Sequence, residues 1–312
     1  MSSFPSVNDL LDPELAAIID QFAYLEYTDA TVKEMREMLQ PTPASPLPAV
    51  RREDRIVSHD PEVIVRTHRP VGAVALSPGV ISMHGGGFII GNRTFDDPRL
   101  DHWCTEFDVV GVSVEYRLSP EVQYPGPLED CYSALSWTFE HADELGIDQD
   151  RVGVTGVSAG GGLAAGLALL ARDRGEFQIA FQLLDCPMID DKQSTASRQR
   201  PGLPMWSREA NDFGWRNYLG GLYGTEEVPE YAAPFRRRDL SGLPPAYISV
   251  GALDGFLDED VTFAARLNGA GVPTELHVYP GAPHGFQLFA GSALADRANR
   301  HMDEWLRNQI ET

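Results

Sequence analysis

Ser158 is the residue whose setting in the sequence could make it a nucleophile. It lies in the stretch GVSAGG at 156–161, with the apolar run RVGVT before it and the long apolar run LAAGLALLARD after it. At a sharp strand-to-helix turn, flanking glycines remove the side chains that would collide, and the hydroxyl is pushed into the open. The N–H of Ala159 opens the helix, has no acceptor inside it and can face an anion. The pattern GxSxG also arises by chance, so a nucleophile needs support from elsewhere in the chain.

The stretch MHGGGFIIG at 83–91 provides a second element of the same chemistry. Three successive glycines after a buried strand let backbone N–H groups approach a ligand without an intervening side chain. Such a loop can bind the negative oxygen of a tetrahedral intermediate. We expect His84 to brace this loop rather than to act as a base.

A nucleophilic serine needs a base, and the base needs a carboxylate that orients it. Asp254 is the first carboxylate after the apolar run AYISVG, and His284 follows the run TELHVY in a loop rich in proline and glycine. Asp258, Glu259 and Asp260 come slightly later, at a predicted helix start. There we expect solvated acids that mainly complement the helix dipole.

Short buried strands alternate with helices through most of the chain, and this pattern positions the three groups. Alternation of this kind predicts an α/β fold with a mostly parallel sheet covered by helices on both faces. Side chains at the strand ends then reach the edge that also carries Ser158. The expected strands are GVISM, VVGVSVEY, RVGVT, IAFQLLD, AYISVG and TELHVY, and the expected helices lie near 127–144, 163–174, 259–270 and 293–309.

Two segments stand outside this alternation. Residues 1–50 contain two helical patterns, the first with Asp12 as N-cap, Pro13 in the first turn and apolar positions up to Phe22, and the second ending before Pro41. A proline-rich connector and the β-like runs IVSH and EVIVRTHR follow. Residues 188–234 are polar and rich in glycine and aromatic residues, without a strand pattern. We expect them to form a partly helical insertion over the carboxyl edge of the sheet.

The composition restricts the classes of partner. A chain of 312 residues with 43% hydrophobic residues can bury one large core. Its formal charge of −21, with only two lysines, repels nucleic acid and anionic membrane surfaces and disfavours strongly anionic substrates. The sequence leaves three alternative explanations of this charge open: adaptation to salt, a solvated acidic surface, or a genome's preference for arginine.

Cysteine usage and hydropathy give further expectations. Cys104, Cys131 and Cys186 are widely spaced without a ligand pattern, so we expect buried thiols and no metal. The first residues lack a basic segment followed by an apolar core, and no later run reaches the roughly 20 apolar residues of a membrane span. We therefore expect a cytoplasmic protein without a membrane span, and the sequence leaves a homo-oligomer open.

The motifs together resemble the hormone-sensitive-lipase family of α/β-hydrolase esterases, of the bacterial carboxylesterase type. The matching stretches are HGGGF at 84–88, YRLSPE at 116–121, GVSAGG at 156–161, the acid at 254 and HGF at 284–286. They cover nearly the whole chain from about residue 50. The chain order serine, aspartate, histidine is also that of α/β-hydrolase triads. The resemblance implies a catalytic domain at 51–312, with 1–50 and 188–234 as cap segments.

The resemblance also implies a role for each site residue. The triad would consist of Ser158 as nucleophile, His284 as general base and Asp254 as orienting carboxylate. The oxyanion hole would consist of the N–H groups of Gly86, Gly87 and Ala159. The residues expected to contact the substrate are Phe88, Val157, Trp206 and Trp215, although these aromatic side chains could equally form the core of the cap.

The expected activity is hydrolysis of short to medium neutral acyl esters through an acyl-serine intermediate, without cofactor or metal. The same triad would also serve an amidase, a carbamate hydrolase or a lactone hydrolase. A non-catalytic ligand receptor on the same fold is a further alternative, against which His284 argues. Two positions depart from the family pattern. Val157 stands where many members have aspartate, and Gly255 follows Asp254 where many have proline, which leaves substrate preference and local rigidity open.

Overall fold

A sheet of eight strands carries the catalytic segments. The computed structural model describes residues 6–21, 26–39, 45–72 and 75–311, and within them the strand order is β1-β2-β4-β3-β5-β6-β7-β8. β1 pairs antiparallel with β2, and β2 pairs antiparallel with β4, whereas all remaining pairs are parallel. The strands are β1 (Val50–His59), β2 (Glu62–Pro70), β3 (Ser77–Met83), β4 (Val110–Glu115), β5 (Ile147–Val157), β6 (Phe181–Asp185), β7 (Ala246–Gly251) and β8 (Thr274–Tyr279).

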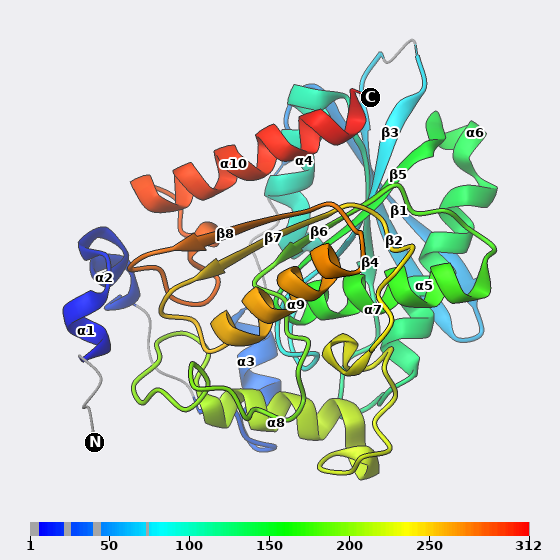
Figure 1. Ribbon diagram of the computed structural model, residues 1–312. Coiled ribbons are helices and arrows are strands. Elements are labelled where there is room, and N and C mark those ends of the chain that lie inside the picture. Colours follow the sequence, from blue (N-terminus) through cyan, green and yellow to red (C-terminus); the bar gives the residue numbers. More distant parts are fainter. Residues whose placement is uncertain (1–5, 22–25, 40–44, 73–74, 312) are drawn as a thin grey trace.

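Helices cover both faces of the sheet, as Figure 1 shows. α4 and α10 lie on one face, where Trp103 and Trp305 pack against Val80 of β3. α5, α7 and α9 lie on the other face, and Ile81 of β3 faces them. The helices of the catalytic domain and the insertion are α4 (Asp97–Phe107), α5 (Gly126–Glu140), α6 (Ala142–Leu145), α7 (Ala159–Arg174), α8 (Arg208–Leu219), α9 (Leu257–Gly269) and α10 (Ala293–Ile310). Short 3₁₀ turns lie at η1 (Arg93–Asp96), η2 (Gly220–Leu222), η3 (Pro234–Arg236) and η4 (Phe286–Leu288).

The predicted α/β class is confirmed, and most predicted elements are found with small shifts of their ends. The helix predicted near 127–144 is divided into α5 and α6, and the helix predicted from 163 begins at Ala159. α4 is missing from the predicted elements, although Leu100, Trp103 and Cys104 supply a buried stripe at helical spacing. Many polar residues separate these three, and Pro98 lies in the first turn. A search for apolar strands and helices in alternation therefore misses this short helix.

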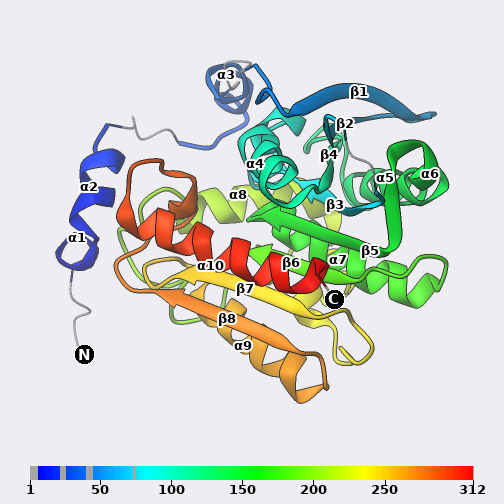
Figure 2. The same cartoon turned by 90° about the horizontal axis from the view of Figure 1, so that it is seen from above.

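The N-terminal helices α1 (Val7–Leu10), α2 (Pro13–Ile19) and α3 (Val32–Met38) lie outside the sheet (Figure 2). The predicted N-cap is confirmed, because the Asp12 carboxylate accepts hydrogen bonds from the N–H groups of Glu14 and Leu15. Leu15 is fully buried in a cluster with residues that follow β8. The predicted positions of Phe22 and Pro41 lie outside the described residues.

α3 is joined to the loops at the carboxyl ends of β3 and β4. The guanidinium of Arg36 donates hydrogen bonds to the carbonyls of Ile89 and Ser119, at 2.7 Å each, and forms an ion pair with Glu121. α2 is joined to the loop after β8, where the N–H of Asp12 donates to the Gly281 carbonyl. The described N-terminal residues therefore contact the loops after β3, β4 and β8, at the end of the sheet where Ser158 lies. Among the described helices, none combines the length and the apolar character that crossing a membrane requires.

Candidate active site

Ser158 occupies a sharp turn between the end of β5 and the start of α7. Its backbone has φ 57° and ψ −119°, a strained conformation for a residue with a side chain. A Cβ on Gly156 would lie 2.3 Å from the carbonyl carbon of Gly160, and a Cβ on Gly160 would lie 1.9 Å from the Met83 carbonyl oxygen. Only glycine fits at both positions. The GxSxG pattern is therefore a packing requirement of this turn, as the sequence predicts.

The structure brings the three predicted triad residues together. The Ser158 Oγ lies 2.9 Å from Nε2 of His284, and Nδ1 of His284 lies 2.7 Å from Oδ2 of Asp254. The other carboxylate oxygen of Asp254 accepts the N–H of Phe256 at 2.9 Å. Ser158, His284 and Asp254 are 4%, 8% and 2% exposed as whole residues. With the proton on Nδ1, which the carboxylate favours, Nε2 is free to accept the serine proton.

The glycine-rich loop lies directly beside the serine. A Cβ on Gly85 would lie 3.7 Å from the Cβ of Ser158. Gly86 and Gly87 have φ of 120° and 59°, and the Gly86 carbonyl accepts the N–H groups of Ile89 and Ile90. In a trans peptide the N–H points away from the carbonyl, so the N–H of Gly87 points out of this turn. The N–H of Ala159, at the first position of α7, has no acceptor inside the helix.

His84 supports this loop and takes no part in the triad. Its ring is completely buried, stacks on the ring of Tyr116 at a centroid distance of 4.1 Å, and its Nδ1 lies 2.8 Å from the Gly85 carbonyl. Burial lowers the pKa of His84 below that of a free histidine, which favours the neutral ring. These contacts agree with the brace that the sequence predicts.

Comparison with known proteins places this geometry in a family. Residues 80–288, which include the glycine loop, Ser158, Asp254 and His284, match the model of a family described as having the alpha/beta hydrolase fold. The chain belongs to this α/β-hydrolase family. The matched region covers about two thirds of the 312 residues and contains the parallel strands β4 to β8 and most of β3.

Several relatives of this α/β hydrolase are named as esterases. The chain is 35% identical to the carboxylesterase NlhH of Mycobacterium tuberculosis over 90% of each chain, and 34% identical to the esterase LipI of the same organism over 93% of this chain and 92% of that one. A solved structure named bacterial heroin esterase superposes with a TM-score of 0.91 at 38% identity, covering 97% of this chain and 99% of the other. The resemblance to hormone-sensitive-lipase-type esterases that the motifs predict is confirmed.

Of the four residues expected to contact substrate, Trp206 lies over the site. A Cβ on Gly87 would lie 2.2 Å from the indole Cη2, and the indole centroid lies 6.3 Å from that of the His284 ring. The indole Nε1 donates to Oδ1 of Asn211 at 3.0 Å, and Tyr27 contacts the ring edge to face at 5.1 Å. The Trp206 side chain is therefore held in place beside the glycine loop and forms a wall there.

The other three residues have different surroundings. Phe88 stacks on Tyr218 at 4.0 Å, and Trp215 packs against Phe88 at 5.4 Å, so both rings belong to the main hydrophobic core. Val157 directly precedes the serine and is buried in a small cluster with Cys186 and Val250. The core alternative left open by the sequence thus describes Phe88 and Trp215, and Trp206 belongs to the same core cluster while it also lies against Gly87.

The acids at the start of α9 correct one expectation. Glu259 and Asp260 are fully buried, not solvated. The Glu259 Oε1 accepts the N–H groups of Ile189 and Asp190 at 3.2 Å, while the Asp260 carboxyl forms no hydrogen bond with any described residue. Burial raises the pKa of both groups well above the usual range of carboxyls. The insertion covers this helix start, which a local reading of the sequence does not show.

Arg198 is a site residue that the sequence reasoning missed. It belongs to the insertion, is fully buried, and lies against the turn of Gly255 and Phe256, directly after the triad carboxylate. An arginine within a polar loop has no local signature of burial. The departure from proline at position 255 was the one available signal, because it marks altered packing at this turn.

Cys186 also borders the triad. All three cysteines are buried and free, as expected. The Cys186 Sγ and the ligand-type atoms of Asp254 and His284 lie within 4.8 Å of one another. Burial raises the pKa of the Cys186 thiol well above the usual range, which disfavours the thiolate that a metal ion binds. The carboxylate and imidazole are already hydrogen-bonded to each other, so the arrangement suits proton transfer better than ligation.

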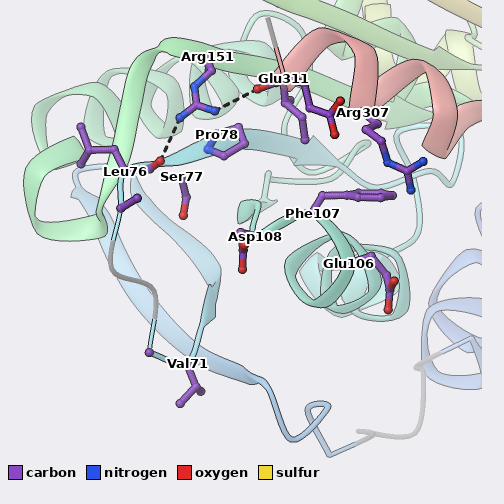
Figure 3. A pocket seen from close by; sticks show the side chains of 13 residues that line it. Val71, Leu76, Ser77, Pro78, Glu106, Phe107, Asp108, Arg151, Arg307 and Glu311 are labelled. Carbon is purple, nitrogen blue, oxygen red and sulfur yellow. Dashed lines mark hydrogen bonds between the residues drawn. The ribbon is translucent and has the colours of Figure 1, made fainter.

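A separate hollow lies at the opposite edge of the sheet, where β3 begins (Figure 3). Ser77, Pro78 and Phe107 are among the residues that line it. The guanidinium of Arg151 donates to the carbonyls of Leu76 and Ile310 at 3.0 Å each. The guanidinium of Arg151 is therefore occupied by backbone carbonyls. The hollow lies at the opposite end of the strands from Ser158.

Proposed function

We propose that this α/β hydrolase is a serine carboxylesterase that cleaves neutral esters with short to medium acyl groups. The observation that carries the proposal is the hydrogen-bonded line from Ser158 through His284 to Asp254, next to the glycine loop. The names of the relatives support the ester as the scissile bond. The charge of −21 favours a neutral substrate over an anionic one.

Acylation follows from this geometry. The Ser158 Oγ attacks the carbonyl carbon of the ester while its proton passes to Nε2 of His284, and the adjacent Asp254 stabilises the imidazolium that forms. The carbonyl oxygen becomes an oxyanion and accepts hydrogen bonds from backbone N–H groups. These donors are Gly86, Gly87 and Ala159, and each is worth on the order of 3 kcal/mol to the barrier.

The intermediate then collapses and the acyl group is released. His284 returns the proton to the alcohol oxygen, the C–O bond breaks, and the alcohol leaves an acyl-serine behind. A water molecule gives its proton to Nε2 of the same histidine and attacks the acyl carbon. The second oxyanion uses the same donors. Collapse returns the proton to Ser158 and releases the carboxylic acid.

Trp206 supports a limit on substrate size. Its indole is held by Asn211 and Tyr27 and covers Gly87, so it restricts the space beside the reacting carbonyl. We expect activity to peak at acyl groups of roughly four to eight carbons, because this wall and the surrounding insertion leave little room for a long chain. A cytoplasmic location, the absence of a nucleic-acid partner and a homo-oligomer stay predictions from the sequence.

The proposal is tested with p-nitrophenyl esters from acetate to palmitate, using the natural chain, Ser158→Ala and the control Ser136→Ala. The Ser136 hydroxyl lies at a partly exposed position on α5 and donates a hydrogen bond to Glu140. We expect its loss to leave turnover unchanged. Ser158→Ala should abolish turnover of every ester. Equal turnover in Ser158→Ala would exclude the assigned nucleophile, and faster cleavage of a matched amide than of the ester would favour an amidase.

A further inference from the structure

Arg198 places a buried cation on the turn that carries the triad carboxylate. The residue is 0% exposed, and its guanidinium carbon lies 4.2 Å from the centroid of the Phe256 ring. A Cβ on Gly255 would lie 2.5 Å from Nη1 and 2.6 Å from the guanidinium carbon. The space that a proline or any other side chain would occupy at position 255 is therefore filled by Arg198.

Carboxyl groups surround this guanidinium, and they compensate for the cost of burying it. Arg198 forms no hydrogen bond with a described residue, although all of its side-chain nitrogens are buried. An isolated cation in such a place is strongly unfavourable. Glu259 is its strongest electrostatic partner, followed by Asp254, Asp260 and Asp190. One cation thus faces several buried acids, one of which is the triad carboxylate.

The chain next to Arg198 is attached to the same turn. The N–H of Ser197 donates to Oδ2 of Asp258 at 2.8 Å, and the Ser197 hydroxyl donates to the Gly255 carbonyl at 2.8 Å. Phe256 is the link to the triad. Its N–H donates to the Asp254 carboxylate, and its ring packs edge to face on the His284 ring at 5.0 Å.

We propose that Arg198 is a positioning residue for the hydrolysis at Ser158, holding the Asp254–Phe256 turn against His284. The inference rests on the proposed function for its ester readout. The guanidinium lies over the Phe256 ring, and the His284 ring contacts that same ring edge to face. The insertion and the triad are thereby one packed unit, and Gly255 is the residue that makes room for this contact.

The test compares Arg198→Met, Arg198→Lys and the double variant Arg198→Met with Glu259→Gln. Arg198→Met should lower kcat for p-nitrophenyl butyrate by about 10- to 100-fold with KM changed less than about threefold, since a small misplacement of the triad acts on the chemical step. The double variant should stay within about threefold of Arg198→Met in kcat, because the raised pKa of Glu259 already favours its uncharged form, which glutamine resembles, and the contact with Phe256 is still missing. The lysine variant, which keeps the charge without the planar stacking, should lie between natural chain and Arg198→Met.

Arg208→Met is the matched control. Arg208 belongs to the same insertion, but it is exposed and bonds Gln199, so kcat should stay within about twofold of the natural value. Circular dichroism and melting curves show whether each variant is folded. The melting temperature of Arg198→Met should also fall as pH rises from 5 to 8, and it should fall less in the double variant. The raised pKa of Glu259 means that its ionisation opposes folding, and glutamine removes this titration.

Labelling of Ser158 with a fluorophosphonate probe separates this inference from the proposed function, because it reports nucleophile activation without an ester substrate. The labelling rates of Arg198→Met and of the double variant should both fall about 10- to 100-fold. A natural chain that labels rapidly but cleaves no ester would contradict only the proposed ester activity. A folded Arg198→Met that labels and turns over at the natural rate, or a double variant that labels at the natural rate, would overturn the positioning role.

Discussion

Replacement of Asp254 by asparagine tests the hydrogen-bonded line at its least obvious member. In the natural chain one carboxylate oxygen faces Nδ1 of His284 at 2.7 Å and the other accepts the N–H of Phe256 at 2.9 Å. Asparagine has only one acceptor oxygen. If this oxygen bonds Phe256, the amide N–H group faces Nδ1, which must then accept, and the histidine proton moves to Nε2. In that tautomer the ring cannot take the proton of Ser158.

The magnitude follows from this loss of the competent tautomer and of the charge beside the imidazolium. The corresponding change in a serine protease lowers kcat by about ten-thousandfold, which is about 5 kcal/mol of transition-state stabilisation. Asp254 is only 2% exposed, so water cannot substitute for the missing acceptor. We expect kcat to fall by about 1,000- to 10,000-fold and KM to change by less than about fivefold, since the substrate does not touch this residue.

The assay measures kcat for p-nitrophenyl butyrate near pH 8 for Asp254→Asn, Asp258→Asn and Asp260→Asn, with circular dichroism to check folding. Asp258→Asn keeps an oxygen that can accept the N–H of Ser197, and its cost should stay below about tenfold. Burial and the charges of Glu259 and Asp254 raise the pKa of Asp260 and favour its uncharged form, which asparagine resembles. A crippled Asp258→Asn beside an active Asp254→Asn would refute the reasoning and require a different orienting acid.

Four further predictions concern residues at or beside the three site residues. Ser158→Ala should abolish ester turnover and change the melting temperature by less than about 2 °C, since one hydroxyl contributes little to packing; a stopped assay and a melting curve check both. Gly87→Ala should lower kcat by about 100-fold or more, because a Cβ at φ 59° would lie 2.2 Å from Trp206; the measurement is kcat of the folded variant compared with kcat of the natural chain. Trp206→Ala should raise the ratio of kcat/KM for octanoate over butyrate, and an unchanged ratio would show that this wall does not limit the acyl chain. Gly255→Ala should lower the free energy of unfolding by about 1–3 kcal/mol in urea titrations, because its methyl group would overlap Arg198.

The sequence by itself determined the features that depend on residues close together in the chain. The turn at Ser158 could be predicted because only glycine fits at Gly156 and Gly160 once a strand is followed immediately by a helix. The N-cap at Asp12 and the strands at 246–251 and 274–279 were equally local. The order of Ser158, Asp254 and His284 along these elements was enough to predict their meeting, because the carboxyl ends of parallel strands share one edge.

Only the tertiary structure decided which side chains the N-terminal residues and residues 188–234 cover. The burial of Glu259 at the start of α9 depends on the insertion, since its Oε1 accepts the N–H groups of Ile189 and Asp190, some 70 residues earlier. The same packing buries Arg198 against Phe256. A polar loop and a helix start each look solvated when read alone.

The aromatic residues of the insertion show the same limit. Trp206 and Trp215 are both apolar residues in a polar segment, and their sequence surroundings do not distinguish a pocket wall from a core residue. Both belong to the main hydrophobic core, but Trp206 also lies against Gly87 beside the reacting groups, whereas Trp215 packs on Phe88. Burial is a property of the assembled surfaces, and short-range sequence patterns carry no record of which distant surface will cover them.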